Sequence, residues 1–294
     1  MSKPGMIEDD GTYGGRLRVC AWPPRVQDPS KVRLIEAKEL ATWQMGEEDD
    51  VLAFNKPGDV VCHPSKAGPW SSLAGAVKEG YGLAKAHLIF RLDRETSGIV
   101  LFAKDERAAS RLQKALQAGR IQKTYLTVLV GELAGPVSVD QPLGDDEHSP
   151  VFMKTTVRAD GKPARSHFRP LLVAGGFTLA EVRIETGRKH QIRAHAHWLG
   201  FPVVGDKIYG PDARCYLEFI DRGWTPELAA KLLLPRQALH CARIELLGNA
   251  EGLGGRVWRA ALAGDMRSFG AERMGGAAAL DAALAGFLLP ALDG

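Results

Sequence analysis

Short apolar segments separated by polar turns recur along the chain and predict a structure with more strands than helices. The apolar run at 51–54 precedes Lys56-Pro57-Gly58-Asp59, a strong turn signal, so we expect strand, turn and strand over 51–61. Two further apolar runs, 87–90 and 99–104, flank a charged segment that a glycine closes. β-Branched or alternating apolar residues predict more strands at 123–133, 178–185, 238–247 and 257–262.

Helical periodicity is clearest over 105–119, where Asp105 is a suitable N-cap and a glycine ends the segment. An alanine-rich helix is expected over 271–289, interrupted by a Gly-Gly pair, whereas residues 1–45 are typical of loops. Strands outnumber helices and do not alternate strictly with them, which predicts an α+β fold around a largely antiparallel or mixed sheet. The helical repeat over 105–119 consists of Ala108, Leu112 and Leu116.

A third helix is predicted for residues 189–199, KHQIRAHAHWL, which lie between two glycines. At about 100° per residue this helix has two opposite faces. One face can pack on a sheet while the other presents Arg193 between two imidazoles. The first face consists of Ile192, His195, Ala196 and Leu199, and the second of His190, Arg193, Ala194 and His197.

The composition is that of an ordinary globular protein, with 294 residues, 45% hydrophobic and 25% charged. It excludes a disordered tail and a fibrous repeat, and the length fits one large domain or two modest ones. No apolar run reaches the ~18–20 residues that a membrane span needs, and the polar N-terminus lacks the core of a signal peptide. Four widely spaced cysteines without a C-x-x-C pair predict a reducing, cytoplasmic location.

Positive charge is concentrated in two internal segments, although the net charge is only +3. Residues 85–130 carry +5 and residues 154–195 carry +6, so the rest of the chain carries −8. If the fold joins the two segments, they form one basic face suited to a polyanion such as nucleic acid. A modest local excess is also typical of a solvated face, so charge alone leaves both interpretations open.

The charged segment 91–98, RLDRETSG, is the first candidate for chemistry. Asp93 lies between Arg91 and Arg94, and neighbouring cations favour the ionised form of a carboxylate. An ionised carboxylate on a loop between two strands can act as a nucleophile or a general base. The four residues RLDR alone are more typical of a structural turn, so the hypothesis depends on the whole block.

A metal site is an alternative that the histidines raise. His190, His195 and His197 are close in sequence, and Asp206 follows them. If 195–197 were a strand, the two imidazoles of H-x-H would point the same way, as metal sites often require. The predicted helix instead directs His195 away from the other two, which disfavours this alternative.

The block FRLDRETSGIVLFAK resembles the catalytic motif of the RluA-type RNA pseudouridine synthases, H-R-L-D-x-x-T-S-G followed by an apolar strand and Ala-Lys. Other blocks resemble the family's remaining motifs in the family's order, and together they cover residues 50 to 247. One departure is Phe90, where the family usually has His; we expect activity to be kept and a supporting hydrogen bond to be lost. The other blocks are Asn55-Lys56-Pro57-Gly58 with His63-Pro64, Lys123-Thr124-Tyr125 through Val130-Gly131, Thr186 to His195, Phe201 to Gly210, and Leu239-His240-Cys241.

The resemblance implies an isomerase active site. Asp93 matches the family's essential aspartate, which attacks the target uridine so that the N-glycosidic bond breaks and uracil turns and rejoins through C5. Tyr125 matches the tyrosine that packs on the base and helps to remove the C5 proton, and Arg193 matches the arginine that pairs with the aspartate. Arg91 matches an arginine implicated in displacing the target base, which must leave its stack to expose the reacting atoms. Substrate contacts are expected from Arg91, Arg94, Thr96, Arg188, Lys189, His190, Gln191 and Ile192.

The resemblance also implies an α+β catalytic domain with a bent, mostly antiparallel mixed sheet flanked by helices and loops, and an active site in a basic cleft. It implies an enzyme that acts on ribosomal or transfer RNA, without metal or cofactor because the isomerisation is redox-neutral. No obligate protein partner is implied, and a monomer would suffice. We expect an N-terminal extension at 1–45 without an S4-like module, a catalytic domain at 46–262 and an Ala/Gly-rich helical tail at 263–294. The alternative is a non-catalytic RNA-binding or ribosome-assembly protein on the same scaffold, although a pure binder needs no such aspartate, tyrosine and arginine together.

Overall fold

The computed structural model describes residues 33–48, 50–63, 68–248, 252 and 254–288. The strands are β1 (Gln44–Glu47), β2 (Val51–Lys56), β3 (His87–Leu88), β4 (Ser97–Ala103), β5 (Ile121–Val130), β6 (Val137–Asp140), β7 (Leu143–Asp145), β8 (Thr155–Val157), β9 (Arg165–Ala174), β10 (Phe177–Ile184), β11 (Leu239–Leu246) and β12 (Val257–Arg259). The helices are α1 (Ala37–Trp43), α2 (Leu73–Gly80), α3 (Glu106–Gln117), α4 (Gln191–Trp198), α5 (Arg214–Arg222), α6 (Pro226–Leu232), α7 (Gly264–Arg273) and α8 (Ala277–Leu288), and Pro69–Ser71 form a 3-10 turn.

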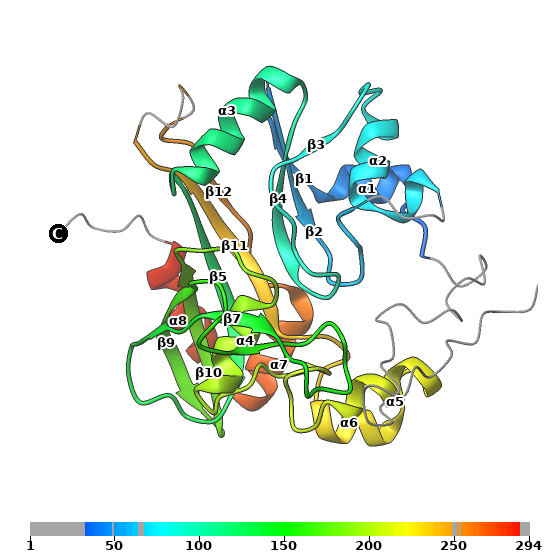
Figure 1. Ribbon diagram of the computed structural model, residues 1–294. Coiled ribbons are helices and arrows are strands. Elements are labelled where there is room, and N and C mark those ends of the chain that lie inside the picture. Colours follow the sequence, from blue (N-terminus) through cyan, green and yellow to red (C-terminus); the bar gives the residue numbers. More distant parts are fainter. Residues whose placement is uncertain (1–32, 49, 64–67, 249–251, 253, 289–294) are drawn as a thin grey trace, which may run out of the picture.

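A ten-stranded sheet forms the centre of the molecule, with eight strands in the order β1-β2-β4-β11-β5-β10-β9-β6 (Figure 1). β3 also pairs with β4, β12 with β11, and β7 and β8 form a separate small sheet. Among these strands only β11 and β4 run parallel to each other. The predicted α+β class with a mixed, mostly antiparallel sheet is therefore confirmed.

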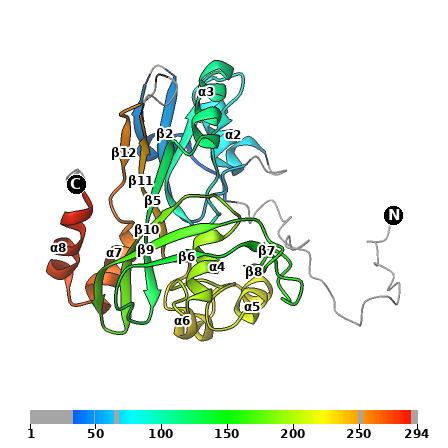
Figure 2. The same cartoon turned by 60° about the vertical axis from the view of Figure 1, so that its left-hand side comes forward.

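Helices cover both faces of the sheet. Figure 2 shows α7 and α8 on one face, and α4, α5, α6 and the β7–β8 pair on the other. The helices α7 and α8 belong to the main core, because Met266, Phe269 and Leu280 are buried in the same cluster as the sheet residues. The Phe269 ring meets the Phe177 ring of β10 edge-on at 5.0 Å. Residues 264–288 therefore pack against the sheet and share its core.

The parallel contact between β4 and β11 places the loop 91–96 at the middle of the sheet. Only two residue pairs make this contact, His240 with Ser97 and Cys241 with Gly98. Gly98 has a φ of +109°, and a Cβ atom there would overlap the backbone of Cys241. Glycine is thus required where the two strands meet, and the loop before it emerges beside the central strand β5.

Most predicted elements are present. The helix predicted over 105–119 is α3, and the Asp105 side chain accepts a hydrogen bond from the Ala108 amide at 2.8 Å, as an N-cap does. The second strand expected within 51–61 is absent, because residues 57–63 form a turn and irregular loop. The expectation of loops up to residue 45 was wrong for 37–43, where α1 buries Leu40, and residues 1–32 lie outside the described part. No helix in the described part is long and apolar enough to cross a membrane.

Candidate active site

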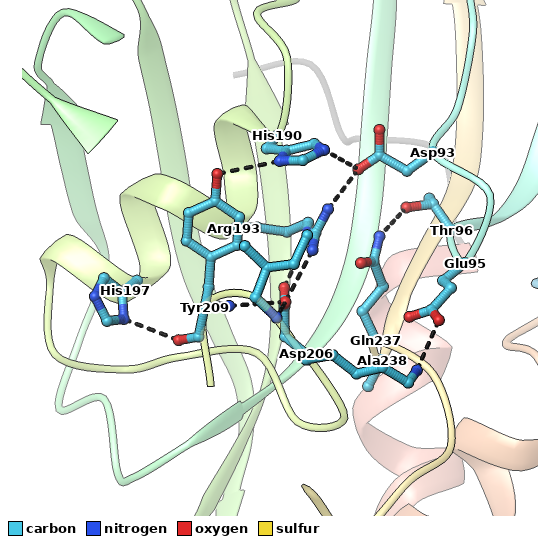
Figure 3. A network of polar contacts seen from close by, with 12 residues as sticks. Asp93, Glu95, Thr96, His190, Arg193, His197, Asp206, Tyr209, Gln237 and Ala238 are labelled. Atoms are coloured by element: carbon cyan, nitrogen blue, oxygen red, sulfur yellow. Dashed lines mark hydrogen bonds and ion pairs between the residues drawn. The ribbon is translucent and has the colours of Figure 1, made fainter. Parts of the chain in front are cut away.

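Arg193 joins two carboxylates that come from distant parts of the chain (Figure 3). Its Nη1 donates to Asp93 Oδ2 at 3.0 Å, while Nε and Nη2 donate to the two oxygens of Asp206 at 2.6 and 2.8 Å. The Asp206 side chain is fully buried and also accepts the backbone amides of Ile208 and Tyr209. The Asp93 side chain remains 30% exposed, so Asp93 is the member of this network that a substrate can reach.

The electrostatic surroundings keep Asp93 ionised. Burial alone would raise the pKa of Asp93, but the charges of His190 and Arg193 and the hydrogen bond from Arg193 lower it below its ordinary value. Burial lowers the pKa of His190 itself to about 4, so this ring is neutral at pH 7 and Arg193 is then the dominant cation. An ionised carboxylate held on one oxygen and partly open to solvent can act as a nucleophile.

His190 connects Asp93 to a buried tyrosine. Its Nε2 lies 4.0 Å from Asp93 Oδ2, and its Nδ1 lies 3.1 Å from the Tyr209 hydroxyl. The same hydroxyl accepts the Thr155 amide at 2.8 Å, so its own proton is available to the neutral His190 ring. His190 has a φ of 56°, an unusual value for a residue other than glycine. The neighbouring Gln191 fixes this turn with its side-chain amide, which bonds four protein groups.

The loop that carries Asp93 is attached to the rest of the protein at several points. The buried Lys56 Nζ donates to the carbonyl oxygens of Pro57, Val60 and Arg94 at 2.7, 2.9 and 3.1 Å. The Gln237 side-chain amide donates to Thr96 Oγ1 at 2.6 Å, and Thr96 is buried inside the protein. Two further hydrogen bonds hold Glu95 of this loop. Lys207 Nζ donates to Glu95 Oε1 at 2.6 Å, and Arg236 Nη1 donates to the Glu95 carbonyl oxygen at 3.1 Å.

Tyr125 lies in the middle of β5, directly opposite Cys241 of β11 and Val182 of β10. Burial and the neighbouring Cys241 and Asp93 raise the pKa of Tyr125 well above its usual value, so the hydroxyl stays protonated at neutral pH. Asp93 is thus near enough to contribute to this shift, and Arg193 contacts Asp93 directly. The structure thus brings together Asp93, Tyr125 and Arg193 from a loop, a strand and a helix.

Comparison with known proteins shows the family to which the chain belongs. Residues 50–198 match the family model described as RNA pseudouridylate synthase, which is half of the chain. The chain belongs to the RluA-type RNA pseudouridine synthases. The predicted family is therefore confirmed, and residues 93, 125 and 193 all lie within the matched region.

Individual relatives agree with this assignment. An RNA pseudouridine synthase of Chloroflexus aurantiacus is 36% identical over 67% of this chain and 59% of its own length. The ribosomal large subunit pseudouridine synthase D of Yersinia pestis is 34% identical over 75% of this chain and 67% of its own. The chain thus spans 59% to 67% of the length of these two relatives. A solved structure of human RNA pseudouridylate synthase domain containing 4 shares the fold, with a TM-score of 0.60 and 22% identity over 78% of this chain and 92% of that one.

Several residues predicted to contact the substrate lie on the surface of the protein. Arg91 and Arg94 are exposed on either side of Asp93, and Arg91 makes no hydrogen bond or ion pair with a described residue. Arg188 donates to the Pro163 carbonyl at 2.9 Å, and Lys189 pairs with Asp145 at 2.7 Å. Both line a cavity of about 580 Å³ next to His190. This cavity carries charges of both signs, from Asp145, Glu147, Arg158, Asp160, Lys162, Arg188 and Lys189.

Other predicted contacts point into the protein. Ile192 is buried in the main core, and the Gln191 amide is occupied by protein groups, so neither offers a free polar atom to a substrate. His195 lies on α4, and its ring contacts Ser166 Oγ and the Gln141 carbonyl, so the strand arrangement considered for a metal site is not formed. The described residues contain no group of three or more side chains able to hold a metal ion.

Asp206 and Tyr209 are site residues that the sequence interpretation did not select. Both belong to the block Phe201 to Gly210, whose resemblance to a family motif was the available signal. A buried carboxylate needs a cation, and Arg193 was the arginine expected to pair with a carboxylate in the site, so a second carboxylate partner could have been proposed. Phe90, the departure from the family, is half-buried, and its ring lies 5.0 Å from the Lys123 ammonium.

Proposed function

We propose that this chain isomerises uridine to pseudouridine in ribosomal RNA, with Asp93 as the nucleophile. The observation that carries the proposal is the contact of Arg193 with Asp93 Oδ2, which leaves Oδ1 directed away from the arginine (Figure 3). Ribosomal RNA is favoured over transfer RNA because relatives at 32–35% identity are named as ribosomal large subunit enzymes. A cofactor is not needed, because the reaction exchanges one bond at C1′ for another without oxidation or reduction.

The reaction starts with a target uridine displaced from its stack, because C1′ and C5 are otherwise inaccessible. Asp93 Oδ1 forms a bond to C1′, and the N1–C1′ bond breaks with its electron pair passing to N1 of uracil. The released uracil turns within the site, and C5 attacks C1′ while the carboxylate leaves. Arg193 balances the charge on Asp93 in the first and last states, which are the states in which the carboxylate is free.

The final step removes the proton from C5. Tyr125 matches the residue to which the family assigns a part in this step, but its raised pKa makes the neutral hydroxyl a poor base. Asp93 is ionised and is released at this stage, so we assign the C5 proton to its carboxylate, which then gives a proton to N1 of the product and is ionised again. We assign the packing of the base to Tyr125. Tyr125 is suited to packing because an aromatic ring at the centre of the sheet offers a rigid surface for a base.

Substrate contacts are assigned by accessibility. Arg91 and Arg94 are exposed beside Asp93, and either guanidinium can enter the space left by the displaced base or contact its phosphate. Arg188 and Lys189 line the adjacent cavity and can contact the flanking RNA backbone. His190, Gln191, Ile192 and Thr96 act through the protein, by holding the turn before α4 and the loop around Asp93.

Domain boundaries, oligomeric state and location are part of the same proposal. The catalytic unit consists of residues 46–262, and the tail from 263 stabilises it by packing on the sheet as far as residue 288. Such a unit can act as a monomer, because the three proposed catalytic residues come from one chain. The proposed RNA substrate supports a cytoplasmic location, as do the free cysteines at 62, 215 and 241.

Tritium release from RNA labelled at uridine C5 tests the function directly, because isomerisation replaces the C5 hydrogen. The substrates are transcripts of large-subunit ribosomal RNA and of transfer RNA, both free of pseudouridine. We expect release from the ribosomal transcript by the wild-type chain and none by the Asp93→Asn variant, with the exposed Asp281→Asn variant on α8 as matched control. Release from transfer RNA alone would overturn the assignment of substrate.

The competing function is RNA binding without catalysis. It predicts that neither transcript releases tritium although the wild-type chain binds RNA, and that Asp93→Asn binds equally well. That result would overturn the proposed synthase. The presence of a polarised, solvent-accessible carboxylate supports catalysis, because RNA binding alone gains nothing from an extra negative charge beside the substrate.

A further inference from the structure

Lys123 occupies a position between the two segments that form the active site. It lies on β5 two residues before Tyr125, so the two side chains point to the same face of the sheet. Its Nζ lies 5.0 Å from the centroid of the Phe90 ring, on the segment that leads to Asp93. A Cβ atom on Gly187, in the turn that leads to His190, would lie 3.5 Å from the same nitrogen.

The charge of Lys123 is not neutralised within the described part of the chain. Only 8% of the residue is exposed, and its ammonium makes no ion pair or hydrogen bond with a described residue. Arg193 and Lys207 differ, because Arg193 contacts two carboxylates and Lys207 pairs with Glu95. The buried Lys56 also differs, because its ammonium donates to three carbonyl oxygens. Burial lowers the pKa of Lys123, as expected for a cation that lacks an anionic partner.

An aromatic ring holds a cation differently from a carboxylate. A cation–π contact contributes ~0.5–2 kcal/mol, depending on solvent exposure. The ring is uncharged, so the ammonium of Lys123 keeps its positive charge while Phe90 restricts its position. A site built in this way is ready to receive an anion that comes from outside the chain.

We propose that Lys123 binds a phosphate of the RNA backbone next to the target uridine, and that Phe90 positions its ammonium for this contact. The proposal rests on the proposed RNA-modifying function and adds a substrate contact to the same site. RNA carries a phosphate at each nucleotide, and a lysine ammonium interacts with phosphate as a compact point charge. A uracil carbonyl is the other acceptor within the substrate, but it is neutral and would leave the buried charge without a counter-charge.

The salt dependence of RNA binding tests this contact. Each phosphate neutralised by the protein changes the slope of log Kd against log salt concentration by about 0.7 for single-stranded RNA and about 0.9 for a duplex. The comparison uses Lys123→Met in an Asp93→Asn background, so that no chemistry occurs, with transcripts of large-subunit ribosomal RNA and transfer RNA as probes. We expect the slope to fall by that amount and the Kd at about 100 mM salt to rise about fivefold to tenfold.

Three further variants separate the phosphate contact from a structural role. Lys123→Arg keeps the charge, and we expect it to restore the wild-type slope. Phe90→Leu keeps an apolar residue but removes the ring, so it should weaken binding in the same direction and by less. Lys104→Met is the matched control, since Lys104 pairs with Glu47 at the opposite end of β4 and its loss should leave the slope unchanged.

The outcomes are distinguishable from failure of the proposed function. An unchanged slope for Lys123→Met overturns the contact. If this variant then loses only kcat, Lys123 contacts the base instead. If it loses only thermal stability, Lys123 has a structural role. A reduced slope in a chain that releases no tritium would overturn the synthase function and support the phosphate contact. A wild-type chain that binds neither RNA would overturn both.

Discussion

Arg193 and Asp206 are joined by two parallel hydrogen bonds inside the protein, and Arg193 reaches Asp93 with its remaining nitrogen. Asp206 is in turn held by the backbone amides of Ile208 and Tyr209. The guanidinium is therefore fixed in one orientation before a substrate binds, and this orientation fixes Asp93 Oδ2. The direction of the proposed nucleophile thus depends on a carboxylate that does not itself face the substrate.

The Asp206→Asn variant tests this dependence. The amide has the shape of the carboxylate but no charge, so the buried Arg193 keeps only the partly exposed Asp93 as a counter-ion. Breaking a buried ion pair costs ~3–5 kcal/mol, and we expect a loss of that order in the free energy of unfolding in urea. We also expect kcat for tritium release to fall by about 100-fold, because a small displacement of a reacting group has an effect of that size.

Asp281→Asn is the matched control for that experiment. Asp281 pairs with the exposed Arg267 on the surface, and exposed ion pairs contribute ~0–1 kcal/mol. An Asp206→Asn variant as stable and as active as the Asp281→Asn variant would show that Arg193 does not need the buried carboxylate.

Replacement of the Tyr209 hydroxyl should affect His190 and, through it, Asp93. The Tyr209→Phe change leaves the Thr155 amide and the His190 Nδ1 without the partner that both now share. We expect a loss of ~1–3 kcal/mol in unfolding free energy for the unpaired buried groups, and a severalfold decrease in kcat. Tyr216→Phe is the control, because the Tyr216 hydroxyl makes no hydrogen bond with a described residue. Equal unfolding free energies for the two variants would contradict the role given to this hydroxyl.

Local sequence signals were sufficient for the elements whose determinants lie within a few residues. The helix α3 is an example, since its N-cap Asp105 and its apolar repeat are both within one segment. The strand β9 was missed because Arg165, Arg169 and Pro170 interrupt its apolar pattern. Those residues are tolerated because the pairing with β10 shifts register at Pro170 and because Arg169 pairs with Glu181 of that strand.

The family motif supplied the positions of Asp93, Tyr125 and Arg193, but their surroundings needed the structure. For the 189–199 helix, the prediction that Arg193 and His190 share one face is correct. Asp206 and Tyr209 cover this face, so it is not open. Periodicity in the sequence defines the faces of a helix, but it does not predict which later segment of the chain will fold over a face. The burial of Gln191 could not be predicted for the same reason, because its partners Arg165 and Ser166 lie on β9.

Lys56 should control the position of the loop that carries Asp93. Its ammonium donates to three carbonyl groups, one of which belongs to Arg94, and burial lowers its pKa to about 8. We expect Lys56→Met to lower the unfolding free energy by about 2 kcal/mol, because buried acceptors lose their donor, and to lower kcat at least tenfold as the loop relaxes. The exposed Lys38→Met variant is the control, and a Lys56→Met variant with wild-type kcat would exclude this role.

The buried His240 should make the protein less stable in mild acid. Burial lowers its pKa from the ordinary 6.5 to about 4, and its Nδ1 bonds Ser97 Oγ while its Nε2 has no partner among the described residues. Between these two values the unfolded chain binds a proton that the folded chain does not, so stability must fall as the pH falls through this window. One pKa unit corresponds to ~1.4 kcal/mol, so His240 alone contributes a loss of about 2 kcal/mol between pH 7 and pH 5.

Urea unfolding of the wild-type chain and of His240→Gln at pH 7 and pH 5 measures this contribution. The variant cannot take up a proton at this position, so its stability should change less between the two pH values, by about 2 kcal/mol. His148→Gln is the matched control, since this histidine is exposed and its replacement should leave the wild-type pH dependence in place. If His240→Gln loses as much stability on acidification as the wild-type chain, the His240 ring is protonated in the folded state. The contact with Ser97, which starts β4 directly after the Asp93 loop, would then have to tolerate a charge.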